Sequence, residues 1–588
     1  MNVNHGRDQN FTSGHGTTVI NNSPSESGLQ KLATHAAFSA LHNSKSRGPE
    51  TRCLRGTRER VIEELSHWIE SADSEQLCWF YGGAGVGKSA VAQTICEKYR
   101  DSHLAASFFY SHNDSSRNSL DPLIPTIAHQ LATNPTFENA GFTSAINEII
   151  QTKPGVFDMR WDDQFEWLIR EPLARIKLER DELPILIVID GLDECMGRSR
   201  STSDMISSST SDAIKAQETL LSIIQNATSA KPPLPLRFLI LSRPEHAIRH
   251  FFRSTPSKPG PAHKPVDMRD FRPEADRDIR LFLEEKFAAL PDLHPEAMIQ
   301  AGWPGEDIIL NLVHKSDGHF IYVVTAMKYI SQRDDPELKL PQQRLNIILR
   351  TDETLHPDLS DLDQLYHHIL RQFTNVRERM LLPILQLLVT THHRPDNFSD
   401  PFRYTDFEIP WRSRHSIAKI VDLDSRQVAT IFSRLHSVFR VSEDHEEDSY
   451  VSFLHASFSE FLTERRRSHD FYVQPMDRHS YLDLLSRRLL PILAAMTHRY
   501  QAGDNQVQLV DWTTKIEIRS INVWTFVKKA LASQSYIPSD GLISALNSFD
   551  MFQYVNMLLD WLVPPPNHAP PAQSYLRIMC LLGSIWNP

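Results

Sequence analysis

The 588-residue sequence predicts an α/β protein with a central, mostly parallel sheet. Three apolar runs indicate this fold class: residues 77–81, 185–189 and 238–241 each have the pattern of a strand buried on both faces. Each run ends in a polar or glycine-rich turn. Roughly a hundred residues separate the first run from the second, which leaves room for the helical crossovers that parallel strands require.

A glycine-rich segment, GGAGVGKS, follows the first predicted strand and precedes a helical pattern over residues 89–95. It fits G-x-x-x-x-G-K-[ST], in which glycines let successive backbone N–H groups point into one concavity at the positive end of a helix. Such a concavity binds phosphate, with the lysine on the β- and γ-phosphates and the serine hydroxyl on Mg²⁺. A glycine-rich turn with a chance Gly-Lys-Ser is the competing interpretation. The residues predicted to bind nucleotide here are Gly82, Gly83, Ala84, Gly85, Val86, Gly87, Lys88, Ser89 and Ala90.

Acidic residues follow the second predicted strand, in the segment IDGLDEC. Asp190 ends the strand, where a carboxylate can hold the Mg²⁺ shell together with Ser89. Asp193 and Glu194 could orient or deprotonate an attacking water, and we prefer Glu194 for that role. An ordinary strand ending in a polar turn is the alternative.

An arginine follows the third predicted strand. Arg243 would lie at the carboxyl edge of the sheet, where open α/β sheets bind their ligands, and could read the γ-phosphate. A surface arginine after a strand is an equally common arrangement.

Composition and charge argue against several classes of binding partner and cellular compartment. The net charge of −11 argues against gripping nucleic acid as the main function. The five cysteines are scattered and lack C-x-x-C spacing, so we expect neither a disulfide framework nor a zinc site. No apolar run has the length of a membrane span, and the first residues lack the apolar core of a signal peptide. We expect a cytoplasmic protein without nucleic-acid partners or membrane spans.

Three segments, GGAGVGKS, ILIVIDGLDEC and RFLILSRPE, resemble in that order the NACHT domains of fungal signal-transduction NTPases of the nephrocystin-3-like group. The resemblance covers residues 50–465 and includes a Cys-x-x-Gly-Thr-Arg pattern at residues 53–58. It implies a switch of the NOD-like receptor type, held off by ADP and opened by exchange for ATP. It further implies a role in non-self recognition or programmed cell death, a homo-oligomer when activated, and protein partners that the sequence does not identify.

The same resemblance assigns lid modules after the nucleotide domain. Residues 424–436 predict an amphipathic helix behind an aspartate or serine cap, and a hairpin with an acidic turn follows, as in the winged-helix domain of such switches. Because a wing this acidic is a poor phosphate partner, we expect it to close the nucleotide cleft. His455 stands where related proteins place a histidine on the β-phosphate of ADP, although Ala456 replaces the aspartate of their motif. A histidine that merely caps or packs is an equal alternative.

The sequence leaves two questions open: which nucleobase is bound, and whether the nucleotide is hydrolysed. The segment HKSD at residues 314–317 resembles a guanine-reading motif but departs in its first residue and lies in a helical pattern, so we favour ATP over GTP. Gly318 is placed to end that helix, and Gly318-His319-Phe320 replaces the glycine-leucine-proline turn that contacts the base in related switches. The main hypothesis is a switch with slow hydrolysis at most. The alternatives are an active ATPase remodeller and an inactive scaffold stabilised by nucleotide.

The predicted organisation has six parts. A serine-rich stretch at residues 197–212 is expected to form a surface loop within the nucleotide domain. The parts are a disordered tail (1–27), a helical connector (28–70), a P-loop NTPase domain (71–260), a helical subdomain (261–350), a winged-helix-like domain (351–470) and an all-α C-terminal region (471–588).

Overall fold

The computed structural model describes most of the chain between residues 27 and 477 and a smaller share of the chain beyond residue 477. The described ranges are 27–45, 52–71, 73–112, 116–176, 186–196, 209–229, 234–253, 263–333, 340–350, 359–373, 377–393, 414–441, 451–477 and 539–550, with residues 47, 114 and 553 and some residues between 480 and 494. The predicted tail, apart from its last residue, and most of the serine-rich stretch lie outside these ranges.

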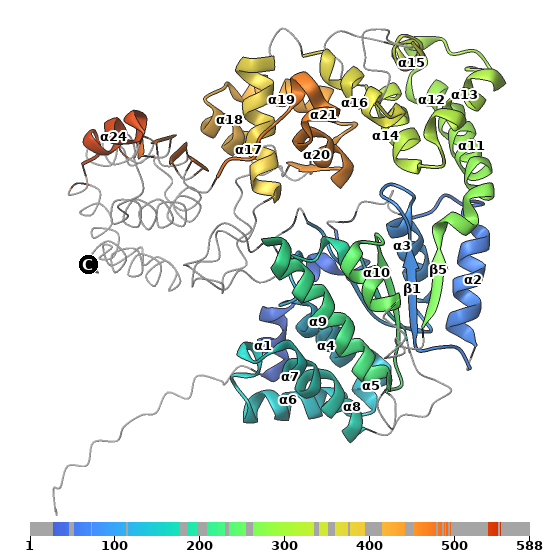
Figure 1. Cartoon of the computed structure of the whole chain (residues 1–588), viewed down its shortest axis with the longest axis vertical. Helices are drawn as coiled ribbons and strands as arrows, with labels where there is room; N and C mark the ends of the chain where they lie inside the picture. The colour runs from blue at the N-terminus through green and yellow to red at the C-terminus, as the bar shows by residue number, and fades with distance from the viewer. Residues whose placement is uncertain are drawn as a thin grey trace, which may run out of the picture.

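Five parallel strands form the central sheet, in the order β2-β3-β4-β1-β5 (Figure 1). The α/β fold predicted from the sequence is therefore confirmed. Strand β1 has the predicted bounds, β3 ends at Asp190 as predicted, and β4 is longer than the predicted apolar run by one residue at each end. The strands are β1 (Leu77–Tyr81), β2 (Leu104–Phe109), β3 (Leu186–Asp190), β4 (Arg237–Ser242) and β5 (Lys264–Asp267).

Helices cover both faces of this sheet because side chains alternate along each strand. Cys78 and Phe80 of β1 pack with helices α2 (Glu59–Glu70) and α3 (Lys88–Tyr99). Leu77 and Trp79 point to the opposite face, which α4 (Leu123–Thr133), α9 (Ser209–Ser229) and α10 (His246–Arg253) cover. Because α9 begins at Ser209, the serine-rich loop ends earlier than predicted.

Shorter helices complete this α/β domain. Helix α1 (Gly28–His35) packs against α4 and α6 (Phe142–Thr152), and Leu29 N donates to Asn147 Oδ1 at 2.7 Å. The others are η1 (Phe38–Ala40), α5 (Pro135–Asn139), η3 (Val156–Asp158), α7 (Trp161–Phe165), the π-helical turn η4 (Glu166–Arg170), α8 (Glu171–Arg175), η6 (Leu192–Glu194) and η7 (Met268–Phe271).

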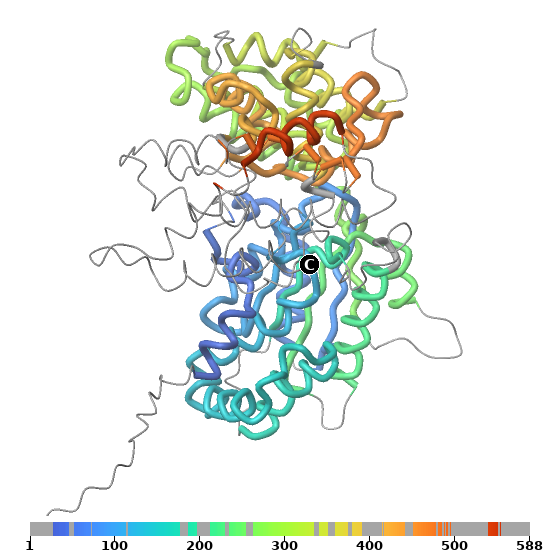
Figure 2. The backbone as a smooth tube through the Cα atoms, turned by 90° about the vertical axis from the view of Figure 1, so that its left-hand side faces the viewer, coloured from blue at the N-terminus to red at the C-terminus, as the bar shows by residue number. Residues whose placement is uncertain are grey.

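A second body, mostly helical, shares one hydrophobic core and stacks on the α/β domain (Figure 2). We call it the helical body. Its elements are α11 (Arg272–Ala288), α12 (Leu290–Leu293), η8 (Pro295–Ala297), α13 (Glu306–Ser316), α14 (Phe320–Ile330), α15 (Pro341–Leu349), α16 (Asp361–Arg371), η10 (Arg377–Leu381), α17 (Leu382–His393), α18 (Arg414–Val421), α19 (Ser425–Arg434), β6 (Phe439–Val441), β7 (Val451–Phe453), α20 (Ala456–Thr463), α21 (Arg465–Ser468), η13 (His469–Phe471) and the more distant α24 (Asp540–Asn547).

Three predictions for this body are confirmed at the level of local structure. Asp424 caps α19 in a capping box, its side chain accepting from Arg426 N at 2.8 Å. The antiparallel pair β6 and β7 follows, with Phe439 opposite Phe453. Gly318, at φ +75°, lies in the turn between α13 and α14, as predicted.

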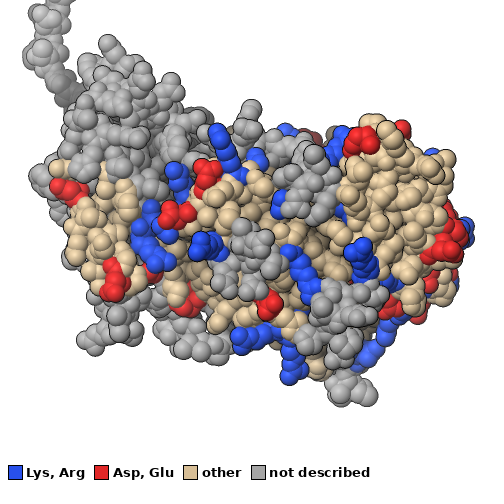
Figure 3. All heavy atoms as spheres, turned by 90° about the horizontal axis from the view of Figure 1, so that it is seen from above, with Lys and Arg blue, Asp and Glu red and all other residues tan. Residues whose placement is uncertain are grey.

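On the side seen from above, the basic and acidic side chains of the described residues are scattered among uncharged ones (Figure 3). Within the described ranges, no helix combines the length and apolar character needed to cross a membrane.

Candidate functional site

The loop between β1 and α3 has the strand, turn and helix context that its glycines predict. Gly85 and Gly87 have φ angles of +71° and +96°, a left-handed conformation that glycine adopts without steric cost. Gly87 is the N-cap of α3, so the first N–H groups of that helix face the loop. This arrangement can bind an anion through its backbone.

Lys88 folds back over this loop. Its ammonium donates to Gly82 O at 2.9 Å and to Gly83 O at 2.8 Å. Burial lowers the pKa of Lys88, while the nearby charges of Asp193 and Asp190 act in the opposite direction. The lysine therefore lies between the glycine-rich loop and the acids that follow β3.

Asp190 ends β3 and is buried against the start of α3. Ser89 hydrogen-bonds to its side chain, and burial raises the pKa of Asp190 despite that bond and the positive charges of Arg47 and Lys88. Its Oδ1 atom has no hydrogen-bond partner among the described residues. A buried unpaired acceptor is costly unless it binds something. Since Mg²⁺ keeps several water and phosphate ligands, the two oxygens of Ser89 and Asp190 fit it.

The two acids of η6 differ in their surroundings. Glu194 Oε2 accepts from His112 N at 2.9 Å, and burial, reinforced by the charge of Asp193, raises the pKa of Glu194 to about 7. A carboxyl group with that pKa can take up a proton near neutral pH. Asp193 instead accepts from Arg243 N at 2.8 Å and lies 3.3 Å from its Nε. Asp193 is therefore held by Arg243, whereas Glu194 is hydrogen-bonded to the backbone at His112.

Arg243 follows β4 and reaches the helical body. Its Nη1 lies 2.6 Å from Oε1 of Glu460, on α20. Burial by itself would lower the pKa of Arg243, but the charges of Glu460 and Asp193 outweigh burial and raise it. The residue predicted to read the γ-phosphate is thus held here by two carboxylates, one from each body.

His455 is the N-cap of α20 and lies close to the loop. Burial lowers its pKa to about 4, and the charges of Arg243 and Lys88 contribute to that shift. Its Nδ1 accepts from Ser457 N at 3.1 Å, so the neutral ring carries its proton on Nε2. At neutral pH His455 is therefore an uncharged N–H donor beside two cations.

The first turn of α14 touches the loop directly. Ile321 N donates to Gly85 O at 3.2 Å, and a Cβ atom on Gly85 would lie 2.3 Å from Cγ2 of Ile321. Arg58 adds a second bridge, because its Nη2 donates to Val86 O at 2.7 Å while its guanidinium lies over the ring of Phe320. The helical body therefore contacts the loop directly at Ile321 and indirectly where Phe320 packs on Arg58.

A comparison with known protein families gives a match in the segment that contains most of this site. Residues 56–243 match the family model described as Nephrocystin 3, N-terminal. The match supports a NACHT-like family for this segment, which includes the glycine-rich loop, Asp190, Glu194 and Arg243 but not His455. Among curated proteins, no match to the chain was found.

Several contacts of the site were not predicted from the sequence. Glu460 lies in an ordinary amphipathic helix and carries no motif. Arg47 contributes a positive charge near Asp190, yet burial lowers its pKa to about 10 and no local pattern marks it. Arg58 belongs to the Gly-Thr-Arg pattern, but that pattern does not predict its left-handed φ of +58°. Each of these residues acts across a large sequence separation.

Proposed function

We propose that this protein is a nucleotide-dependent signalling switch of the NACHT type that binds ADP or ATP with Mg²⁺. One observation carries the proposal: the helical body contacts the glycine-rich loop itself, directly through Ile321 N on Gly85 O and indirectly through Phe320, which packs on the Arg58 guanidinium that donates to Val86 O. A ligand bound in the loop therefore contacts the same backbone segment that the helical body contacts.

Such contacts couple nucleotide to conformation. A ligand shifts the balance between closed and open forms only by its differential affinity for them. Arg243 is the residue best placed to supply that difference, because it pairs with Glu460 while lying beside the acids that follow β3. A γ-phosphate near Arg243 would compete with Glu460 for the guanidinium, whereas ADP would leave the ion pair intact.

The remaining roles follow the chemistry of each group. Lys88 and the loop backbone bind phosphate oxygens, His455 donates its Nε2 proton to one of them, and Ser89 with Asp190 holds Mg²⁺. The metal ion supplies charge neutralisation of the phosphates. Glu194, with a pKa of about 7, accepts a proton from the attacking water, and slow hydrolysis serves as the reset of the switch.

The preference for ATP, the homo-oligomer on activation and the cytoplasmic location belong to the same proposal. The role in fungal non-self recognition or programmed cell death rests on the sequence resemblance alone. The winged-helix class proposed for residues 351–470 is supported by the order of α18, α19, the β6–β7 pair and α20.

The test is to purify the full chain without added nucleotide, denature it, and identify what is released by chromatography. We expect stoichiometric ADP from the wild type and none from Lys88→Ala. Lys98→Ala is the matched control, because Lys98 lies on the same helix but donates to Ser66 Oγ, away from the loop. Release of GDP would overturn the base preference, and equal release from both lysine variants would overturn the assigned site.

A further inference from the structure

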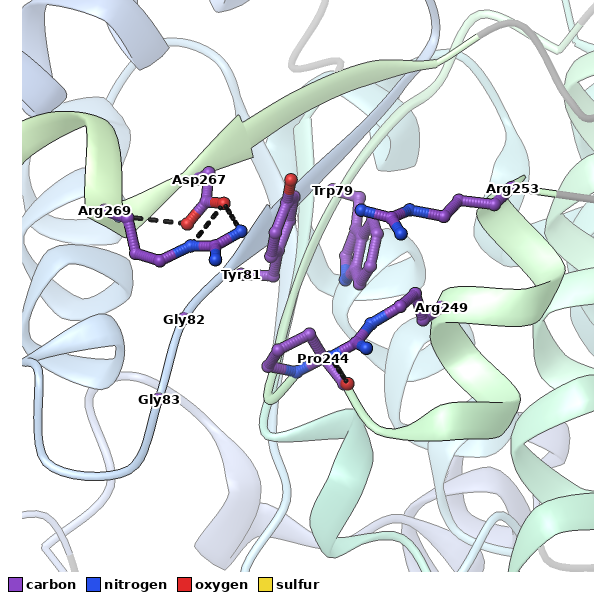
Figure 4. Close-up of a pocket in the computed structure, with 9 residues that line it drawn as sticks. All are labelled: Trp79, Tyr81, Gly82, Gly83, Pro244, Arg249, Arg253, Asp267 and Arg269. Atoms are coloured by element: carbon purple, nitrogen blue, oxygen red, sulfur yellow. Dashed lines mark hydrogen bonds and ion pairs between the residues drawn. The ribbon is translucent and has the colours of Figure 1, made fainter.

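A separate cavity of about 320 Å³ opens at the carboxyl ends of β4, β1 and β5 (Figure 4). It borders Gly82 and Gly83 but lies on the α10 side of the sheet, where Trp79 and Tyr81 point. Helix α3 packs on the other face, with Cys78 and Phe80. The cavity is thus distinct from the concavity at the start of α3.

One wall of the cavity is flat and rigid. Trp79 stacks on Phe252, with ring centroids 4.4 Å apart, and on Tyr81 at 4.1 Å. Its indole N–H donates to Ser242 Oγ at 2.9 Å, which fixes the ring. Because Trp79 is only 2% exposed, the half-buried ring of Tyr81 that stacks on it is the surface that a planar or apolar group of a ligand can contact.

Three guanidinium groups surround the opening, against one carboxylate. Arg269 pairs with Asp267 at 2.6 Å. Arg249 donates to Pro244 O at 2.7 Å and forms no salt bridge with a described residue. Arg253, one helical turn further along α10, makes neither a hydrogen bond nor a salt bridge with a described residue. Figure 4 shows Arg249 and Arg253 extending from α10 toward the cavity on the side of Trp79.

We propose that this cavity is a second ligand site, for a small organic phosphate. The planar fork of an arginine matches two phosphate oxygens, and Arg249 and Arg253 have donors to spare. The volume is at the small end of ligand pockets, which suits a metabolite. The phosphate lies between Arg249 and Arg253, and the rest of the ligand lies against Tyr81 and the edge of Trp79. This proposal does not depend on nucleotide binding at Lys88.

The test uses pyrophosphate as the probe, titrated calorimetrically into the full chain carrying Lys88→Ala, so that the glycine-rich loop contributes little. We expect one site, weakened at least tenfold by adding Arg249→Gln with Arg253→Gln. The matched control adds Arg100→Gln with Arg160→Gln, which removes the same charge from two exposed positions, and leaves the affinity unchanged. Citrate, a carboxylate of similar charge, should bind at least tenfold more weakly than pyrophosphate.

A second readout works in the wild-type chain and needs no variant to fold. Pyrophosphate should protect Arg249 and Arg253 from a dicarbonyl reagent, as measured by peptide mass spectrometry, while Arg100 reacts as before. Absence of protection, equal weakening in the charge-matched control, or citrate binding as tightly as pyrophosphate would each overturn the proposal.

Discussion

Arg243 and Glu460 stand 217 residues apart in the chain and form an ion pair at 2.6 Å that joins the carboxyl edge of the sheet to α20. The pair is only partly exposed, with 23% of the Arg243 side chain and 39% of the Glu460 side chain accessible. Asp193 holds the same guanidinium from the sheet side. Arg243 thus ties the predicted site of the α/β domain to the helical body.

Breaking this pair should loosen the closed form. We expect Glu460→Gln to release a fluorescent ADP analogue roughly fivefold faster than the wild type, because a partly exposed pair contributes about 1 kcal/mol. Stopped-flow displacement by unlabelled ADP measures the rate. Glu464→Gln is the control, since Glu464 pairs more loosely with Arg467 at 3.6 Å. Equal rates for Glu460→Gln and the wild type would contradict the coupling.

A methyl group on the loop should disturb the contact with α14. Gly85→Ala places a Cβ atom 2.3 Å from Ile321 Cγ2 and forces alanine into a φ of +71°, so we expect a loss of about 1–3 kcal/mol in unfolding free energy. Urea denaturation measures it. Gly83→Ala is the control, since its nearest neighbour would be Val86 Cγ1 at 3.9 Å. Ile321→Ala should restore part of the loss, and an equal cost at both glycines would refute the steric account.

The paired oxygens of Ser89 and Asp190 predict a metal-dependent affinity. Adding Mg²⁺ should tighten ADP binding to the wild type by about tenfold, and EDTA should reverse it, whereas Asp190→Asn should bind ADP equally with and without the metal. Asp101→Asn, at an exposed position just beyond the far end of α3, should behave as the wild type does. Persistence of the Mg²⁺ effect in Asp190→Asn would remove Asp190 from the metal site.

The raised pKa of Glu194 predicts a pH-dependent cost to stability. The folded protein holds a proton up to a pKa of about 7 that the unfolded chain releases near 4.5, so stability falls as the pH rises between these values and stays low above them. Glu194→Gln removes the ionisable carboxyl group and therefore this pH-dependent fall in stability. In nucleotide-free protein we expect the unfolding free energy of the variant to exceed that of the wild type by up to about 3 kcal/mol at pH 8, and by much less at pH 4.5.

Denaturant titrations at the two pH values measure this difference. Glu148→Gln, at an exposed position, is the control and should leave the pH dependence of stability as it is in the wild type. If Glu194→Gln also leaves the pH dependence unchanged, Glu194 is ionised like an exposed carboxylate and loses its assignment as a base.

Local sequence alone specified the elements that carry the phosphate loop. The apolar run at residues 77–81, the glycines after it and the helical spacing beyond them correctly predict β1, the loop and α3, because such patterns reflect backbone preference and burial over a few residues. The same holds for Asp190 at the end of β3 and for the capped helix α19. Strand β4 extends one residue beyond the predicted run at each end, since burial and pairing decide where a ladder stops.

The tertiary structure decided which of these elements meet. The ion pair of Arg243 with Glu460, the approach of His455 to Lys88, and the contact of Ile321 with Gly85 join residues far apart in the chain. No short pattern encodes such contacts, because they depend on how two hydrophobic cores stack and not on the preferences of either segment. The arginine-lined cavity beside Trp79 arises in the same way, from the packing of α10 against the edge of the sheet.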